Sequence, residues 1–148
     1  MGKGISISFP DMDKFIANLE NYSKQAKENV SLACADAAFA VNEYAKKNLA
    51  NNHSVITGTL VKSFRVEGSA FTYVAGTDVI YAPDVEYGTA AHEITPKNGK
   101  CLRFEIDGKV IFVRRVHHPG NHAKPFFNPA VEEVRPIFLN ELTAALNA

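Results

Sequence analysis

The feature that most constrains this chain is an uninterrupted helical pattern over residues 11–50. Apolar side chains recur there at an average spacing of about 3.6 residues, the period of a straight α-helix. The stripe comprises Phe15, Leu19, Tyr22, Ala26, Val30, Ala33, Ala37, Val41 and Tyr44. No Gly or Pro interrupts the pattern; Pro10-Asp11 supplies start signals and Asn51-Asn52-His53 ends it. The sequence therefore predicts one long helix.

Such a helix is longer than a compact domain of this size. Forty residues at about 1.5 Å each span roughly 60 Å, whereas a compact chain of 148 residues is about 40 Å across. Either the helix bends or one end projects and needs cover, and a neighbouring copy is the simplest cover. The alanine-rich middle of the stripe would let another helix or sheet approach closely.

The sequence predicts a short strand before the long helix and a β-hairpin after it. Ile5, Ile7 and Phe9 alternate with serines, which indicates a short N-terminal strand. Residues 57–76 indicate a β-hairpin, with Leu60, Phe64 and Val66 on one face of its first strand. Its turn is expected at Gly68-Ser69-Ala70.

Residues 101–116 give the clearest local signal. Asp107-Gly108 is the preferred two-residue turn of a β-hairpin, and it pairs Ile106 with Lys109. The same register pairs Phe104 with Ile111 and Leu102 with Val113. We expect these apolar residues to form a core face. The opposite face carries both charge and apolar surface and is a candidate contact surface; it consists of Arg103, Glu105, Val110, Phe112 and Arg114.

The segments around the second hairpin complete the predicted fold. Tyr81-Ala82-Pro83 is expected to end a strand, because Pro cannot donate to a β-ladder. Residues 88–100 show no periodicity and predict a long functional or mobile loop. A C-terminal helix from about Pro129 has Val131, Val134, Phe138, Leu142 and Leu146 as its stripe, and Pro136 should kink or interrupt it after Arg135.

These elements predict an α+β fold in one domain, residues 1–148. A long N-terminal helix and a C-terminal helix would pack on an antiparallel sheet of four to five strands. The composition, 46% hydrophobic and 22% charged, supports a folded core. No apolar run has the length of a membrane helix, and Cys34 and Cys101 have no metal-ligand or redox spacing, which indicates a reducing compartment.

Charge is balanced overall but not along the chain. Sixteen basic residues face sixteen acidic ones, which argues against strong nucleic-acid binding. Residues 97–124 nevertheless hold seven basic residues against Glu105 and Asp107: Lys97, Lys100, Arg103, Lys109, Arg114, Arg115 and Lys124. Residues 51–96 are acidic on balance. Opposite patches suit head-to-tail contact between copies, and the alternative is a mixed solvated surface.

Catalytic signatures are weak. His92, His117, His118 and His122 are the one candidate metal cluster, but Pro119-Gly120 disfavours the helix that would align the last two. The sequence has no nucleophile elbow and no glycine-rich phosphate loop. No cofactor is therefore predicted. Sequence-independent DNA contact by the basic segment stays open.

Three stretches carry a resemblance to a known family. The first contains Thr57, Gly58, Leu60 and Ser63; the second contains Tyr81, Ala82, Pro83, Glu86, Tyr87, Gly88 and Thr89; the third contains His118, Pro119, Gly120, Pro125, Phe126, Pro129 and Ala130. In their order between two helices, over about residues 11–147, they resemble the small tail-component proteins of siphophages and prophages. These are called gene-product-ten-like, head–tail joining or tail-completion proteins. Phe127-Asn128 departs from the family's usual Leu-Arg pair.

The resemblance implies a structural virion protein and brings no catalytic residues. Its relatives form oligomeric rings in the neck, between the head-closure ring and the tail tube. The implied partners are further copies of the chain and head-closure, tail-tube or tail-terminator proteins. The implied location is the virion neck or tail, and the bacterial host cytoplasm during assembly. A tail-terminator ring and a small metal-dependent enzyme built on the four histidines are the alternatives.

Elementary physics assigns scaffold roles to several of the matched residues. Gly88 permits a turn that other residues resist, and Pro119-Gly120 makes a second turn. Tyr87 is expected to pack its ring inward and Glu86 to pair with a basic residue. Phe126 should enter the core ahead of a helix that has Pro129 in its first turn. Residues 88–100 are expected to order on assembly.

Overall fold

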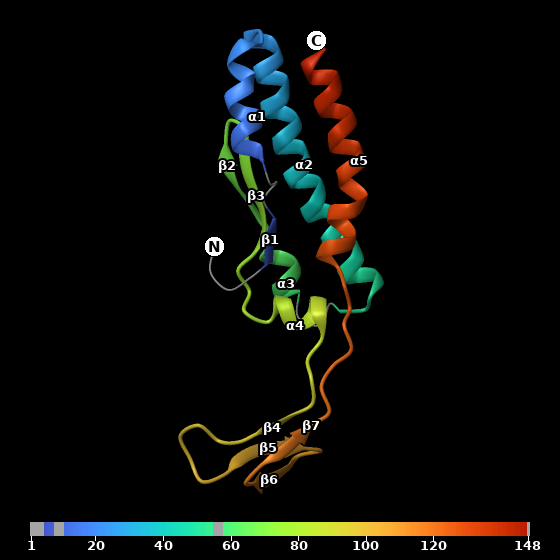
Figure 1. The fold of residues 1–148 in the computed structure, drawn as a ribbon. Coiled ribbons are helices and arrows are strands. Elements are labelled where there is room, and N and C mark those ends of the chain that lie inside the picture. Colours follow the sequence, from blue (N-terminus) through green and yellow to red (C-terminus); the bar gives the residue numbers. More distant parts are fainter. Residues whose placement is uncertain (1–4, 8–10, 55–57, 148) are drawn as a thin grey trace.

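The computed structural model describes the chain except for residues 1–4, 8–10, 55–57 and 148. The chain forms a helical body with one small sheet, and an arm of short strands that extends from one end of the body (Figure 1). Long helices beside antiparallel strands confirm the predicted α+β class. The arm is made by residues from the middle of the chain, between α4 (Ala82–Tyr87) and α5 (Phe127–Leu146).

The predicted continuous helix over 11–50 is wrong, because the chain breaks and reverses near Tyr22 (Figure 1). Helix α1 covers Met12–Asn18, the 3₁₀ helix η1 covers Leu19–Asn21, and α2 covers Lys24–Asn51. Tyr22 is extended, and the Ser23 hydroxyl accepts a hydrogen bond from the Ala26 amide at 3.1 Å. A serine N-cap stabilises a new helix start by about 1 kcal/mol. The reversal shortens the helical part, as the length argument requires.

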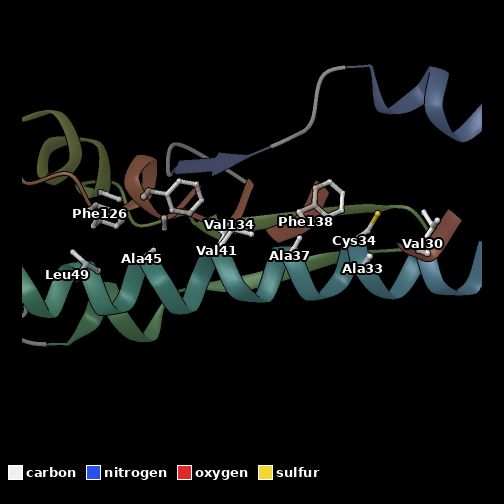
Figure 2. Packing of buried hydrophobic residues seen from close by; sticks show 14 of the residues in the cluster. Val30, Ala33, Cys34, Ala37, Val41, Ala45, Leu49, Phe126, Val134 and Phe138 are labelled. Atoms are coloured by element: carbon white, nitrogen blue, oxygen red, sulfur yellow. The ribbon is translucent and has the colours of Figure 1, made fainter. Parts of the chain in front are cut away.

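The core lies mainly between α2 and α5, which run antiparallel (Figure 1). Figure 2 shows Phe126 opposite Leu49, Val134 opposite Val41 and Phe138 opposite Ala37. Helix α5 continues through Pro136, so the expected interruption does not occur. The burial of Val134 and Phe138 on either side offsets the cost of the proline, about 3 kcal/mol in a helix interior.

A three-stranded antiparallel sheet packs beside α2, in the order β1 (Ile5–Ile7), β3 (Thr72–Thr77), β2 (Arg65–Ser69). The Asn42 side-chain amide donates to the carbonyl of Arg65 at 2.9 Å and ties sheet to helix. The N-terminal strand is confirmed for residues 5–7, while Phe9 lies outside the described residues. The hairpin was predicted too long, because Thr59–Lys62 forms the short helix α3 after the left-handed Gly58. The turn also lies later, with Ala70 at φ 55°.

The prediction that Tyr81-Ala82-Pro83 ends a strand is wrong. Ala82 and Pro83 begin α4, whose first turn needs no donor from Pro83. The following segment is not wholly irregular either, because β4 (His92–Ile94) lies within the expected loop 88–100. Strand β4 pairs antiparallel with β7 (Val116–His118).

The second hairpin forms with the predicted register. Strands β5 (Leu102–Ile106) and β6 (Lys109–Val113) pair Ile106 with Lys109, Phe104 with Ile111, and Leu102 with Val113. A single sheet of four to five strands does not form, because the strands divide into one three-stranded and two two-stranded sheets. Two stalks, residues 88–91 and residues 119–126, connect the arm to the body. They hold the strands of the arm too far from the body sheet to hydrogen-bond with it (Figure 1).

Within the described residues, no helix combines the length and the apolar content needed to cross a bilayer.

Candidate assembly interface

A buried carboxylate joins the arm's base to the body. Glu86 is 1% exposed and lies in α4. One of its carboxylate oxygens accepts hydrogen bonds from the amides of Phe126 and Phe127, each at 2.8 Å, and the other accepts from the amide of Asn128 at 2.9 Å. These are free amides at the start of α5, where the helix dipole also favours negative charge. The expected basic partner of Glu86 is therefore replaced by backbone donors, and Glu86 fixes the start of α5.

Two glycines allow the two stalks of the arm to run side by side at close range. Gly88 has φ 74°, and a Cβ there would lie 2.5 Å from the Asn121 carbonyl oxygen. Gly120 has φ 86°, and its Cβ would lie 2.3 Å from the Thr89 carbonyl oxygen. Thr89 and Asn121 exchange backbone hydrogen bonds at 3.0 and 3.1 Å. The positive φ at both positions fits glycine, but no turn forms at Gly88 or at Pro119-Gly120, so the predicted turns are not confirmed. The two glycines instead meet at one junction.

Asn48 of α2 and Asn52, directly after the helix, hold the second stalk where it enters the body. The Asn52 side-chain amide donates to the carbonyl of Pro125 at 2.7 Å, and that of Asn48 donates to the carbonyl of Phe126 at 3.1 Å. Phe126 is fully buried, as predicted. Its ring packs edge-to-face against the ring of Phe64, with 6.0 Å between the two ring centroids. Pro129 and the buried Ala130 follow within the first turns of α5.

The first of the three sequence stretches lies inside the body, beside this junction. Gly58 adopts a left-handed conformation ahead of α3, and Leu60 is buried. The Ser63 hydroxyl donates to the Leu60 carbonyl and lies 2.6 Å from the Thr77 hydroxyl, which is fully buried. Thr57 lies outside the described residues. This stretch therefore supports the end of β3 ahead of α4.

The aromatic residues around α4 point outward. Tyr87 is 64% exposed, so the prediction that its ring packs inward is wrong. Its hydroxyl lies 3.4 Å from the side-chain nitrogen of Asn128, at the surface. Tyr81 precedes α4 and is 40% exposed, whereas Ala82 is buried. The short helix turns Ala82 and Glu86, four residues apart, toward the core and leaves Tyr87 on the other side.

The β5–β6 hairpin exposes both of its faces. The predicted core face is wrong: Phe104 is 38% exposed, Ile106 55% and Ile111 41%. Phe112, on the opposite face, is 63% exposed. Alternation assigned residues to faces correctly but not their burial, because no element of the body covers the hairpin. The arm thus displays two apolar surfaces to solvent.

The arm is also rich in basic side chains that lack ion-pair partners. Among the described residues, no salt bridge involves Arg103, Arg114 or any other lysine or arginine of the 97–124 segment. Arg103 lies directly across from Phe112, and Glu105 directly across from Val110.

Pro119 follows β7 at the arm's base, and the His118 ring nitrogen accepts from the Gly120 amide at 3.0 Å.

The histidines cluster at the base of the arm but do not form a metal site. His92 and His118 stack with ring centroids 5.1 Å apart, whereas His117 faces the other way and contacts Glu93 at 3.1 Å. A groove of about 700 Å³ includes His92, His118 and His122 in its lining. Among the described residues, no three His, Cys, Asp or Glu side chains converge well enough to hold a metal ion. The geometry gives the metal-enzyme alternative no support.

Sequence reasoning missed the most specific part of this region. The role of Glu86 depends on backbone amides 40 and more residues away, and no local pattern announces such a contact. Asn48 and Asn52 gave a weak signal, because partly buried polar residues usually need partners. The sequence pattern indicates only that Asn52 lies at a helix end.

Comparison with known proteins identifies the family. The family described as "Bacteriophage HK97-gp10, putative tail-component" matches residues 13–88. That match covers the body from α1 to the end of α4 and stops where the arm begins. No curated protein and no solved structure was found to match the chain. Since the matched residues make up half of the sequence, the chain belongs to the HK97-gp10-like family of bacteriophage tail components.

Proposed function

We propose that this chain is a structural component of the phage head–tail connection, a tail-completion or neck subunit that acts by oligomeric assembly. The observation that carries the proposal is the β5–β6 hairpin, whose two faces are both exposed and apolar. A two-stranded hairpin is only marginally stable alone in water. An exposed apolar surface of this kind marks a protein contact. The arm therefore becomes fully buried only when the chain meets a partner.

The partners follow from the same surface. Further copies of the chain would form a ring, and head-closure and tail-tube or tail-terminator proteins would lie above and below it. The unpaired basic side chains of the arm also permit weak, sequence-independent contact with DNA in a channel. The subunit would work in the virion neck or tail and assemble in the host cytoplasm. It would perform no chemical step, and the whole chain would act as one domain.

A tail-terminator ring is the second candidate position. It uses the same exposed arm and the same family membership, so the two differ in neighbours and not in the chemistry of the subunit. Cross-linking of intact particles, followed by identification of the proteins joined to the arm, separates them. Links to a head-closure protein support the neck position, and links confined to the tail tube support the terminator position.

Loss of the gene from a phage that encodes this chain tests the proposed function. We expect filled heads and separate tails to accumulate, with infectivity restored by the wild-type chain supplied in trans. A matched chain in which residues 101–115 are replaced by a short Gly-Ser linker should fold but fail to restore infectivity. Normal particle yield without the gene, or absence of the chain from finished particles, would contradict the proposal.

Ordering of residues 88–100 on assembly is part of the proposal. Strand β4 is present in the single chain, but the residues between β4 and β5 form no regular structure. We expect hydrogen exchange in residues 95–101 to slow at least about tenfold in the particle. Equal exchange in the free and assembled protein would rule out the ordering step.

A further inference from the structure

The exposed hairpin has a counterpart on the body, at the far end of the molecule. A groove of about 340 Å³ lies between α2 and α5, where α2 begins and α5 ends. Most of its lining is apolar and consists of Leu32, Ala33, Ala144 and Ala145, with Asn29 beside them. Two acidic residues, Asp36 and Glu141, also line it. Neither carboxylate makes a salt bridge among the described residues.

The hairpin presents the complementary pattern. Phe112 is 63% exposed, with Arg103 directly opposite it on β5. Arg114 lies two residues further along the chain, directly after the end of β6. Both guanidinium groups lack a salt-bridge partner within the described part of the chain. An exposed aromatic side chain beside two cations thus matches an apolar groove lined by two anions.

From this match we propose that the Arg103–Phe112–Arg114 face of one copy docks into the α2–α5 groove of another copy. Phe112 fills the groove, and the two arginines pair with Asp36 and Glu141, for which a guanidinium offers two parallel hydrogen bonds. This inference rests on the proposed function, since it names the surfaces by which copies assemble. Leu32, 63% exposed at the edge of the groove, is covered in the same contact.

The contact must join different copies. The hairpin and the groove lie at opposite ends of the elongated molecule (Figure 1), so a chain cannot fill its own groove. The contact therefore uses two different surfaces and is of the head-to-tail type, which closes into a ring when its rotation permits.

Disulfide trapping in particles tests the contact directly. In a Cys101→Ser background, Leu32→Cys and Phe112→Cys are placed on separate copies that are expressed together. We expect dimers that join the two variants under oxidising conditions, and none from either variant alone. Incorporation of both variants without a mixed dimer, or disulfides between two Phe112→Cys copies, would overturn the inference.

Charge reversal provides an independent test. Arg103→Glu with Arg114→Glu, or Asp36→Arg with Glu141→Arg, should each lower incorporation into particles by about tenfold or more, since like charges then face each other. All four changes in one chain should restore incorporation to within about threefold of wild type. Asp13→Arg with Glu133→Arg is the matched control for surface charge, because both residues are exposed and neither forms a salt bridge within the described residues. Unchanged melting temperatures establish folding.

The two proposals fail in different ways. Reversals that leave assembly intact would overturn the docking contact while the chain remains a structural part of the particle. A wild-type chain that never enters particles would overturn the proposed function and the contact together.

Discussion

The body and the arm are built from the same kinds of apolar side chain and treat them in opposite ways. In the body, Phe126, Val41 and Leu49 are at most 2% exposed, and they interlock across α2 and α5 (Figure 2). In the arm, Phe112 and Ile106 are more than half exposed. Burial of a large apolar side chain contributes about 1.5–3 kcal/mol. The apolar residues of the body contribute this free energy when the chain folds. Those of the arm can contribute it only when a partner covers them.

This difference also shows where the protein's specificity lies. The body's polar contacts are directed at its own backbone, as with Glu86 at the start of α5 and Asn42 at the carbonyl of Arg65. The basic groups of the arm have no such internal partners among the described residues. The polar groups of the body are thus paired within the chain, whereas the basic groups of the arm are exposed to solvent. Such a chain is suited to fold first and assemble afterwards.

Removal of one aromatic ring from each region gives the largest contrast. Phe126→Ala should lower the free energy of unfolding by about 3–5 kcal/mol, because it opens a cavity in a closely packed core. Phe112→Ala should change it by less than about 0.5 kcal/mol, since the ring is mostly in water. Urea denaturation of both variants measures this. Similar losses would mean that the arm belongs to the cooperative core.

The connection between the two regions should be nearly as sensitive. Glu86→Ala leaves three buried amides without an acceptor and should destabilise the body by about 3 kcal/mol or more. Glu86→Gln retains an oxygen that can accept from two of them, so we expect roughly half of that loss. Glu133→Ala, on the exposed surface of α5, is the control. Chemical denaturation that ranks Gln below Ala would refute the assigned acceptor role.

Two glycines with the same φ differ in crowding, and Gly88, at ψ 177°, also lies in a backbone region that is essentially restricted to glycine. Gly88 and Gly108 both have φ 74°, but a Cβ at Gly88 would meet backbone atoms whereas one at Gly108 would meet nothing within 4 Å. Gly88→Ala should therefore cost about 2 kcal/mol or more, and Gly108→Ala only about 1 kcal/mol confined to the hairpin. Thermal unfolding of the body should report the first change and barely detect the second.

The two cysteines give the smallest effect on stability. Burial raises the pKa of the Cys34 thiol above its usual value of 9.0. A raised pKa in the folded state favours the protonated thiol, so this contribution is present below pH 9 and is lost as the pH rises further. We expect a loss of less than about 1 kcal/mol above that pH, absent in Cys34→Ala. Thiol reagents at pH 8 should modify the exposed Cys101 first.

Local patterns predicted local structure well. Asp107-Gly108 fixed the pairing of β5 with β6 residue by residue, because a two-residue turn leaves one register. The helical period found most of the residues that face the core, but Tyr22 of the predicted stripe is 43% exposed. The period also missed the break at Ser23, since buried residues on both sides of the reversal face a single core. Serine's preference for helix starts was the signal available there.

Long-range contacts were beyond prediction from the sequence. Alternation showed that Phe104, Ile106 and Ile111 share a face, but burial depends on what lies above that face, and nothing in a single strand reveals it. The acceptor role of Glu86 required knowledge of where α5 begins in space. Pro136 was judged by its local cost alone, although packing of its neighbours offsets that cost.

The hydrogen bonds between Glu86 and the start of α5 have a mechanical consequence. Tension applied to the tip of the arm travels along two stalks that are fastened together at Thr89 and Asn121. It next reaches the Lys124 amide, bonded to the Val85 carbonyl at 2.8 Å, and then the carboxylate with its three amides. A pull is thus shared among parallel hydrogen bonds before any of it strains the helical core. An arm under load would stretch or yield at its root and leave the core intact.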